Sequence, residues 1–347
     1  MDQKSFVLGG VEIPRGTKKR VQIELPRFHG SPSTFLSVDV IRGKRAGPIV
    51  FVSAAIHGDE LNGIEIIRRL RQIHLFDKLE GTLLLVPVVN IYGTASLSRY
   101  LPDRRDLNRS FPGSSKGPLA SRVAKTFFDE IVSICDLGID LHTASIHKDN
   151  LPQIRTNIDN EYTLRLAIAF EAPVVLHSEL KDGSLRAVAQ DNGIPILLYE
   201  AGEALRFDEK SIKIGVKGIV NVLKANGMLP NTSSKGHRAK KTSVSKVSAW
   251  IRAEDGGMIQ TIKKLGDTVK KGEVIAKIHE MYENHGFEIL APFDGIIIGK
   301  TQIPLIHEGD AVFHIAAFDD LKIAEERMEP FYHESMMEIH IEDDTRI

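Results

Sequence analysis

Two histidines and a glutamate stand where predicted strands end, and together they could hold a zinc ion. His57 and Glu60 lie three positions apart in the turn after an apolar strand, and His142 lies near the end of a second one. Ligand sites in open α/β sheets lie at the carboxyl ends of the strands. Two histidines with one carboxylate are typical of catalytic zinc sites that keep one position open for water. We therefore expect one zinc ion bound by these three residues.

Two further carboxylates accompany these strand ends. Asp140 shares a strand face with His142, because alternate residues of a strand point to the same side. We expect it to support that histidine rather than to bind the metal. Glu200 follows the apolar run 196–199, where an ionised carboxylate is costly unless it has a partner or a function. We interpret Glu200 as a general base that takes a proton from the attacking water and passes it to the leaving amine.

The polar segment 106–113 separates the two histidine motifs. The guanidinium group of Arg109 is a planar fork that suits a carboxylate, and Asn108 adds a donor beside it. Taken alone, this segment could equally be a salt-bridged loop. Beside two predicted metal-binding strand ends, we expect Asn108 and Arg109 to bind substrate.

An α/β domain over residues 1–227 is predicted to position these side chains. Its strands are short apolar runs, and its helices carry apolar residues at helical spacing. In chain order the expected elements are strands 35–41 and 48–56, helix 61–76, strand 82–89, helix 118–133, strand 137–141, helix 160–170, strands near 174 and at 196–199, and helix 211–226. Alternating strands and helices indicate a mostly parallel or mixed sheet flanked by helices.

The amino-acid composition changes after residue 227. Residues 228–246 are polar and basic with no acid, which predicts a linker, and 247–318 read as short strands punctuated by glycine. Residues 253–259 match 291–297, a repeat that resembles the barrel-sandwich fold of biotinyl and lipoyl carrier domains. Those carriers need a lysine on the hairpin that corresponds to 279–288, and none is present there. We expect a small all-β barrel-sandwich-like domain without a swinging arm.

Two features near the C-terminus have less specific interpretations. Trp250 opens the first strand of the repeat and is interpreted as a packing anchor between the domains. The acidic tail, residues 319–347, could be a solvated arm or a final strand over the sheet.

Together, five motifs resemble the succinylglutamate desuccinylase/aspartoacylase family, which is related to zinc carboxypeptidases. In order they are Gly47-Pro48, His57-Gly58-Asp59-Glu60, Asp106-Leu107-Asn108-Arg109-Ser110-Phe111-Pro112-Gly113, Asp140-Leu141-His142 and Glu200-Ala201-Gly202. The similarity covers approximately residues 5 to 317, because that family often appends a β domain. The resemblance implies a zinc-carboxypeptidase-like fold.

The resemblance also implies an activity, namely the hydrolysis of a small N-acyl amino acid by a single zinc ion. It makes His57, Glu60 and His142 the metal ligands, and Glu200 matches the catalytic glutamate of the family.

The resemblance assigns substrate contacts as well. Arg99 takes the place of an arginine that polarises the scissile carbonyl, although Arg104 or Arg105 could substitute because the spacing varies among relatives. Asn108 and Arg109 match the residues that hold the substrate carboxylate.

Composition excludes other classes of protein. The 347 residues include 45 Lys and Arg against 46 Asp and Glu, so no global positive field favours nucleic acid or an anionic membrane. Apolar runs are shorter than the ~20 residues of a membrane helix, and the first residues lack a secretory apolar region. The single cysteine, Cys135, cannot form an intramolecular disulfide. We expect a cytoplasmic protein without nucleic acid or membrane partners; the motifs leave a homo-oligomer open.

Two alternative functions remain open from the sequence. The first is a zinc carboxypeptidase acting on a short peptide or peptidoglycan fragment, because Arg109 could hold a C-terminal carboxylate equally well. The second is an inactive binding or scaffold protein, which would be signalled by a lost ligand, whereas every expected position is filled. The motifs do not identify the acyl group or the amine.

Overall fold

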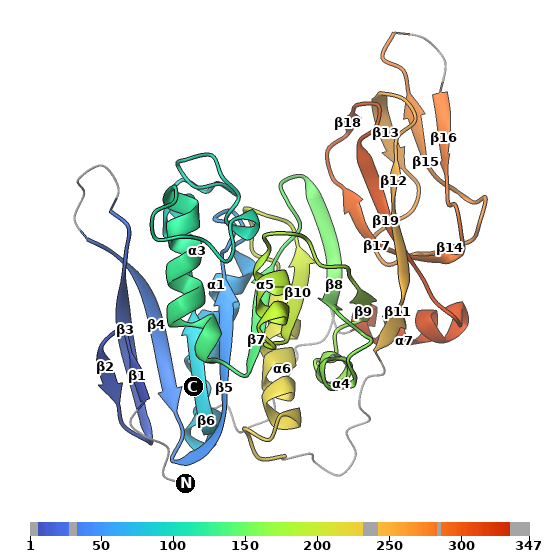
Figure 1. The fold of residues 1–347 in the computed structure, drawn as a ribbon. Coiled ribbons are helices and arrows are strands. Elements are labelled where there is room, and N and C mark those ends of the chain that lie inside the picture. Colours follow the sequence, from blue (N-terminus) through green and yellow to red (C-terminus); the bar gives the residue numbers. More distant parts are fainter. Residues whose placement is uncertain (1–5, 28–32, 232–241, 283–285, 334–347) are drawn as a thin grey trace.

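The computed structural model describes residues 6–27, 33–231, 242–282 and 286–333. One large sheet runs through most of the molecule (Figure 1), in the order β12-β19-β17-β8-β10-β7-β5-β6-β4-β3. The strands of its N-terminal part are β3 (Thr17–Leu25), β4 (Thr34–Arg42), β5 (Arg45–Ala54), β6 (Glu80–Val86), β7 (Leu137–His142), β8 (Lys148–Thr156) and β10 (Ile196–Gly202). A small hairpin of β1 (Phe6–Leu8) and β2 (Val11–Ile13) precedes them.

The centre of this sheet is parallel and its flanks are antiparallel. β5 pairs in parallel with β6 and β7, and β10 pairs in parallel with β7. The outer pairs β4 with β6, β3 with β4, and β8 with β10 are antiparallel. The sheet is therefore mixed, as the alternation of elements in the sequence allowed.

Helices cover both faces of the sheet. The helices are α1 (Asn62–Leu70), α2 (Ile91–Ala95), α3 (Leu119–Glu130), α4 (Glu161–Ala169), α5 (Leu185–Asp191) and α6 (Glu209–Ala225). Val50 and Val52 of β5 pack in the core that contains α1, α4 and α6, whereas Phe51 packs in the core that contains α3 and α5. Successive strand residues point to opposite faces, so a strand covered on both sides reads as an unbroken apolar run.

One helix is shorter than expected. The helix predicted over 61–76 ends as α1 at Leu70, and the chain continues as a 3₁₀ turn over His74–Lys78. The last helix of the domain behaves as predicted, because α6 ends at Ala225 and Gly227 has a φ of 72°. Glycine adopts this left-handed conformation at low cost.

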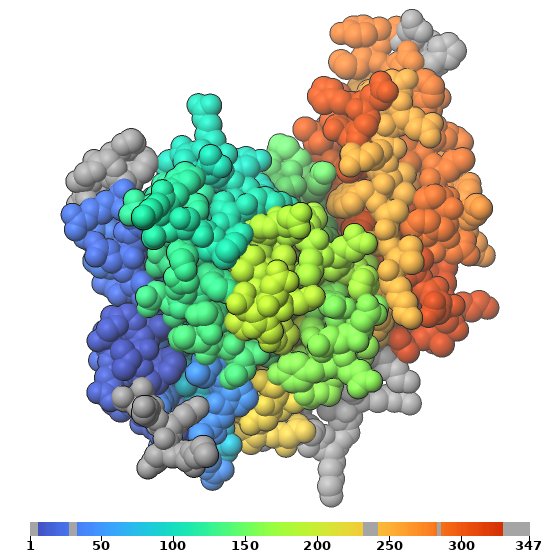
Figure 2. Space-filling view, viewed as in Figure 1, coloured from blue at the N-terminus to red at the C-terminus, as the bar shows by residue number. Residues whose placement is uncertain are grey.

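The C-terminal β region, which we define as β12 to β19, contains strands joined by turns and loops. It comprises β12 (Val247–Arg252), β13 (Gly257–Thr261), β14 (Thr268–Val269), β15 (Val274–His279), β16 (Gly286–Leu290), β17 (Gly295–Thr301), β18 (Leu305–Ile306) and β19 (Ala311–Ala317). The repeat includes a second matching pair, Gly266-Asp267 and Gly309-Asp310, and the two glycines have similar φ values of 88° and 84°. Figure 2 shows the C-terminal β region against one side of the α/β part.

This region is joined to the α/β part by main-chain hydrogen bonds. β17 pairs antiparallel with β8, and Gly299 is the partner of Asn150. β12 and β19 extend the same sheet, while β13, β15, β16 and β18 form a separate four-stranded sheet. The large sheet therefore passes from one part of the chain into the other without a break.

The segment predicted as a linker and the acidic tail both contain regular structure. Ser243–Ser245 form β11, which pairs in parallel with β9 (Val174–His177). The remaining centre of that segment, 232–241, lies outside the described residues. The tail forms a helix, α7 (Leu321–His333), rather than an arm or a strand, and Ala324 and Met328 pack in a small core against β17. Residues 334–347 lie outside the described part of the chain. In that described part, no helix is long and apolar enough to cross a membrane.

Candidate active site

A constrained turn follows β5 and carries His57 and Glu60. Ala55 has a φ of 51°, a left-handed conformation that costs a non-glycine residue on the order of 1–3 kcal/mol. Gly58 packs so closely on Gly93 that a Cβ atom at Gly58 would lie 2.0 Å from the carbonyl carbon of Gly93. Strain and close packing fix the path of the backbone, so the two side chains have defined directions.

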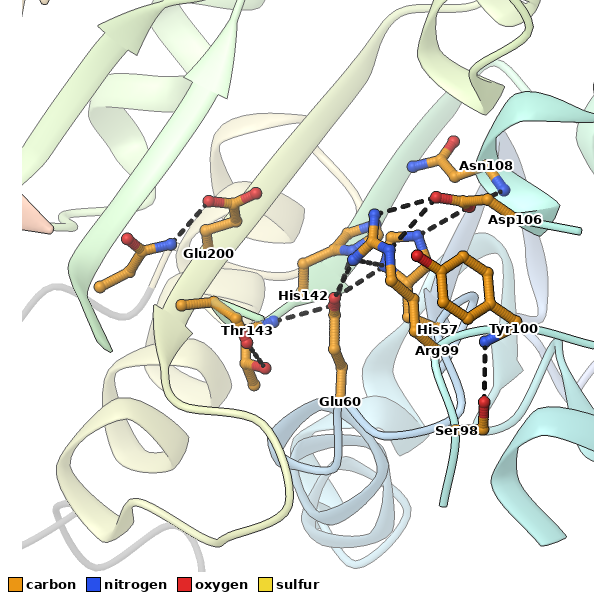
Figure 3. Close-up of polar contacts among 12 residues, drawn as sticks. His57, Glu60, Ser98, Arg99, Tyr100, Asp106, Asn108, His142, Thr143 and Glu200 are labelled. Atoms are coloured by element: carbon orange, nitrogen blue, oxygen red, sulfur yellow. Dashed lines mark hydrogen bonds and ion pairs between the residues drawn. The ribbon is translucent and has the colours of Figure 1, made fainter. Parts of the chain in front are cut away.

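His57, Glu60 and His142 converge in a buried cluster, drawn in Figure 3. Nδ1 of His57 lies 2.7 Å from Oε1 of Glu60, and Nδ1 of His142 lies 2.8 Å from Oε2. One potential ligand atom from each residue lies within 4.8 Å of the others. The amide of Thr143 also donates to Oε2 of Glu60, at 3.1 Å. The three residues predicted as metal ligands are therefore brought together.

The other nitrogen of each imidazole faces a second carboxylate. Nε2 of His57 lies 3.0 Å from Oδ1 of Asp106, and Nε2 of His142 lies 2.8 Å from Oδ2 of Asp140. Such partners orient metal-binding histidines and fix their tautomers. Both Nδ1 atoms consequently face the Glu60 carboxylate, and Asp140 lies where the period of the strand predicted it.

The charges in this cluster are strongly coupled. Burial alone would raise the pKa of Glu60, but the charges of His57 and His142 lower it below its usual range. Burial opposes protonation of both imidazoles, yet Glu60 and the carboxylates behind them raise the pKa of each above 6.5. Two imidazole nitrogens and a carboxylate oxygen are also the donor types that zinc accepts. The cluster therefore fits a divalent cation in place of protons.

Arg99 borders the cluster and lies opposite Asp106. Its Nε and Nη2 atoms lie 3.2 and 3.0 Å from Oδ2 of Asp106, and Nη1 lies 3.4 Å from Oε1 of Glu60. The two alternatives suggested by the sequence lie elsewhere: Arg104 is exposed, and Arg105 lies 4.0 Å from Asp103. Of the three arginines, Arg99 alone lines the cavity described below.

Glu200 lies to one side of the cluster, with Asp106 on the other (Figure 3). It contacts two residues of β8: Nη2 of Arg155 at 2.7 Å and Nδ2 of Asn150 at 2.8 Å, both through Oε2. Neither partner was identified from the sequence. The carboxylate is thus held at the end of β10 without joining the cluster of His57, Glu60 and His142.

The predicted substrate residues lie on the loop before α3. Oδ1 of Asn108 accepts a hydrogen bond of 2.9 Å from the amide of Leu185, which ties this loop to the start of α5. The Arg109 side chain is exposed, and its Nη1 donates to the carbonyl oxygen of Asn108 at 2.5 Å. The Asn108 carboxamide therefore positions this loop, and the exposed Arg109 side chain lines the cavity described below.

All the residues assigned to metal, proton transfer or substrate share one cavity of about 410 Å³. They are His57, Glu60, His142, Glu200, Arg99, Asn108 and Arg109. Residues of the C-terminal β region complete its wall, among them Trp250 and Arg252. A small molecule in this cavity could therefore contact the cluster, both arginines and the Glu200 carboxylate together.

A comparison with known proteins identifies the family of this chain. Residues 46–226 match the model of the succinylglutamate desuccinylase/aspartoacylase catalytic domain, which is more than half of the chain. The chain belongs to the succinylglutamate desuccinylase/aspartoacylase family.

Individual relatives within the family are distant but extensive. The N-alpha-acetyl-L-2,4-diaminobutyric acid deacetylase of Halomonas elongata is 26% identical over 295 residues, 82% of this chain and 86% of that protein. A crystal structure of a succinylglutamate desuccinylase/aspartoacylase from Rhodobacter sphaeroides has a TM-score of 0.77 and 26% identity, covering 87% of this chain and 96% of that one. The product-bound ectoine utilization protein EutE of Ruegeria pomeroyi shares the fold, with a TM-score of 0.77, 24% identity and coverage of 88% and 97%.

Besides Asn150, three residues that support the candidate site were not assigned a role from the sequence. Ser53 donates a 2.7 Å hydrogen bond to Oδ1 of Asp140 and is buried. Ser53 is a polar residue within an otherwise apolar strand, a pattern that could have indicated a buried polar contact. Asp106 lies within a quoted motif, but its contact with His57 depends on tertiary structure. Arg155 lies on β8, a strand that was not predicted.

Proposed function

We propose that this protein is a zinc-dependent hydrolase that cleaves the amide bond of an N-acyl amino acid or a related N-acyl amine. The observation that carries the proposal is the shared cavity, in which the His57, Glu60 and His142 cluster faces Glu200, Arg99 and Arg109. The deacetylase activity named for the Halomonas relative supports the same class of reaction.

His57, Glu60 and His142 would hold the metal, and Asp106 and Asp140 would orient the two imidazoles. A zinc ion there would act as a Lewis acid. It would lower the pKa of a water molecule towards neutral pH and polarise a carbonyl group. The cluster is buried on its protein side and borders the cavity. A substrate can therefore approach it from one direction only.

Glu200 is assigned the proton transfers. Its Oε2 atom is held by Arg155 and Asn150, and Oε1 is the oxygen that we assign to the reaction. It takes a proton from the attacking water and later delivers a proton to the nitrogen of the leaving amine. A positioned general base of this kind typically contributes about 10² to 10⁴ in rate.

Two arginines are assigned to the substrate. Arg99 is held by Asp106, and its guanidinium donors would stabilise the oxygen of the scissile carbonyl as negative charge develops on it. One such preorganised donor is worth roughly 3 kcal/mol. Arg109 would bind the carboxylate of the amino acid, with Asn108 fixing the loop that carries it.

The experiment combines metal analysis with substrate screening. Purified protein should contain about one zinc per chain and should hydrolyse members of a panel of N-acyl amino acids faster than dipeptides of similar size. His57→Ala should lose both the metal and the turnover. A His57→Ala variant with unchanged turnover would contradict the metal assignment, and a preference for dipeptides would favour a carboxypeptidase.

A further inference from the structure

A single row of paired residues crosses the large sheet from β10 to β12. Gly202 of β10 pairs with Asn150 of β8, and Asn150 pairs in turn with Gly299 of β17. Gly299 also pairs with His314 of β19, and His314 pairs with Trp250 of β12. Residues directly opposite each other in neighbouring strands point to the same face of a sheet. This set, which we call the junction row, therefore connects the end of β10 with the part of the cavity wall that Trp250 supplies.

The carboxamide of Asn150 lies between two residues that have no side chain. Both of its neighbours in the junction row, Gly202 and Gly299, are glycines, and Asn150 itself is 4% exposed. Its Nδ2 atom donates to Oε2 of Glu200 at 2.8 Å. The opposite orientation would turn Oδ1 towards the carboxylate, where two acceptors would repel each other. The hydrogen bond to Glu200 therefore fixes the direction in which the carboxamide faces.

Gly299 provides the space that this carboxamide occupies. A Cβ atom at Gly299 would lie 2.8 Å from Oδ1 of Asn150, which is closer than a favourable van der Waals contact. It would also lie 3.1 Å from Cβ of His314 and 3.4 Å from Cη2 of Trp250. A side chain at position 299 would consequently displace Oδ1. Because the Asn150 side chain is short and buried, it cannot turn without moving Nδ2 away from Glu200.

The aromatic end of the junction row is well supported. Trp250 stacks on His314, with ring centroids 4.7 Å apart and an interplanar angle of 10°. Nε2 of His314 lies 2.9 Å from Oγ of Ser248, and burial lowers the pKa of His314 to about 3, so the stacked imidazole is neutral. Nζ of Lys148, at the start of β8, lies 4.9 Å from the centroid of the Trp250 ring, within the range of a cation–π interaction. These contacts hold the two rings in place and leave little room for a side chain at Gly299.

We infer that Asn150 is a positioning residue for the general base, and that the C-terminal β region sets its position through Gly299. Arg155 and Asn150 both donate to Oε2 of Glu200, and two donors restrict the rotation of a carboxylate more than one does. A misplacement of about 1 Å at a reacting group can cost about 10²-fold in rate. The inference rests on the proposed function, because it takes Glu200 as the group that transfers protons. It gives the C-terminal β region a part in catalysis beyond forming a wall of the cavity.

Two substitutions of Asn150 distinguish a positioning role from a merely structural one. Asn150→Ala removes the donor and should lower kcat about tenfold, as expected for a hydrogen bond to a charged group, with little change in KM or in bound zinc. Asn150→Asp keeps the shape but places a second negative charge beside Oε2, so it should lower kcat more than Asn150→Ala does. A structural role predicts the reverse order, because aspartate fills the same space. The matched control is Gln302→Ala, which removes a 3.1 Å hydrogen bond to Oδ2 of Asp149 at the same junction without altering the lining of the cavity.

The loss of activity in Asn150→Asp should also depend on pH. At lower pH the introduced acid takes up a proton and can again donate to Oε2, so kcat relative to the wild type should rise as the pH falls. The cations whose charges act on Glu200, namely Arg155, Arg186 and Lys181, are the same in both proteins. A ratio that does not change with pH would contradict a hydrogen bond between position 150 and Glu200.

A double-mutant cycle tests the link to the C-terminal β region. Gly299→Ala should lower kcat because the added methyl group displaces the Asn150 carboxamide. In the Asn150→Ala background there is no carboxamide to displace, so Gly299→Ala should lower kcat little further, as is typical of two residues in contact. Gly256→Ala is the matched control, because an added Cβ would lie 3.3 Å from its nearest contact, the carbonyl oxygen of Ile306, and Gly256 does not line the cavity. Wild-type kcat in Gly299→Ala, or additive losses in the double variant, would overturn the link.

Crystal structures of the variants separate this inference from the proposed function. In Asn150→Ala and in Gly299→Ala, the Glu200 carboxylate should leave its wild-type position while the metal-binding cluster stays in place. If the wild type hydrolyses no acyl amino acid, a displaced carboxylate would still support the link from Gly299 to Glu200, and the lack of turnover would contradict the proposed function. If the wild type is active and Glu200→Gln is not, an unmoved carboxylate with wild-type kcat in both variants would overturn the inference alone.

Discussion

Oγ of Ser53 lies 2.7 Å from Oδ1 of Asp140, and both residues are buried beneath the candidate metal centre. The other oxygen of Asp140 lies 2.8 Å from Nε2 of His142. A chain of hydrogen bonds thus runs from a neighbouring strand, through Asp140, to a predicted metal ligand. The position of the imidazole is set by a hydroxyl group that never reaches the cavity.

Substitution of the residues that hydrogen-bond behind His142 should weaken zinc binding without removing a ligand. Asp140→Asn should lower zinc affinity about 10- to 100-fold, because partners of metal-binding histidines have effects of that size. Ser53→Ala should have a smaller effect in the same direction. Competition with a chromophoric chelator measures both, and Ser133→Ala at the surface serves as the control. Unchanged affinity in Asp140→Asn would show that the contact does not orient His142.

Glu200→Gln should separate catalysis from metal binding. The amide keeps the shape of the side chain but cannot accept the proton, so kcat should fall by about 10² to 10⁴. Bound zinc should remain at the wild-type level, since Glu200 contacts Arg155 and Asn150 rather than the cluster. Metal analysis and steady-state kinetics on the same preparation check this. Loss of zinc in the variant would place Glu200 among the ligands instead.

Zinc affinity should increase with pH. In the metal-free protein, Glu60 and the carboxylates behind the imidazoles raise the pKa of His57 and His142 above 6.5 despite burial. Below these raised values the histidines carry protons that zinc must displace. Calorimetry in buffers of different ionisation enthalpy should therefore detect proton release on binding, decreasing towards high pH.

The stability of the metal-free protein should follow the opposite trend. A histidine whose pKa is raised by folding contributes stability that is fully present below its unfolded value of about 6.5. This contribution is lost as the pH rises through the folded value. Unfolding of chelator-treated protein should show it, and His142→Ala should remove much of the dependence. A pH-independent difference between the two proteins would contradict the electrostatic account.

Gly58→Ala should destabilise the turn that carries His57 and Glu60. The added Cβ would lie 2.0 Å from backbone atoms of Gly93, so one of the two segments must move, at a cost of about 3 kcal/mol for such overpacking. Gly193→Ala is the matched control, because Gly193 has a φ of 74° but no neighbour within 4 Å of an added Cβ. It should cost only about 1–2 kcal/mol of backbone strain. Chemical denaturation compares them, and an unchanged free energy of unfolding in Gly58→Ala would show that the close approach does not matter.

The site could be anticipated from sequence where strand ends carry polar residues. His57, His142 and Glu200 each follow or end an apolar run, and the topology of the sheet brings those ends to one edge. Asp140 followed from the period of a strand. These arguments need only local pattern and the rule that the ends of parallel strands share one edge.

The partners of Glu200 could not be anticipated in this way. β8 begins with Lys148, Asp149 and Asn150 and contains Pro152, features that argue against a strand. It is held in the sheet by pairing with β10 on one side and with β17 and β9 on the other. Arg155 is positioned by these tertiary contacts, which local sequence patterns do not reveal.

The ladder between β8 and β17 has a consequence for any attempt to divide the chain. Asn150 pairs with Gly299 and Lys148 with Thr301, so removing the C-terminal β region would expose the backbone donors and acceptors of residues 148–150, whereas residues 153–156 would stay paired with β9. An uncovered edge of this kind recruits strands from other molecules. A shortened protein should therefore self-associate, whereas the intact chain should melt in a single cooperative transition.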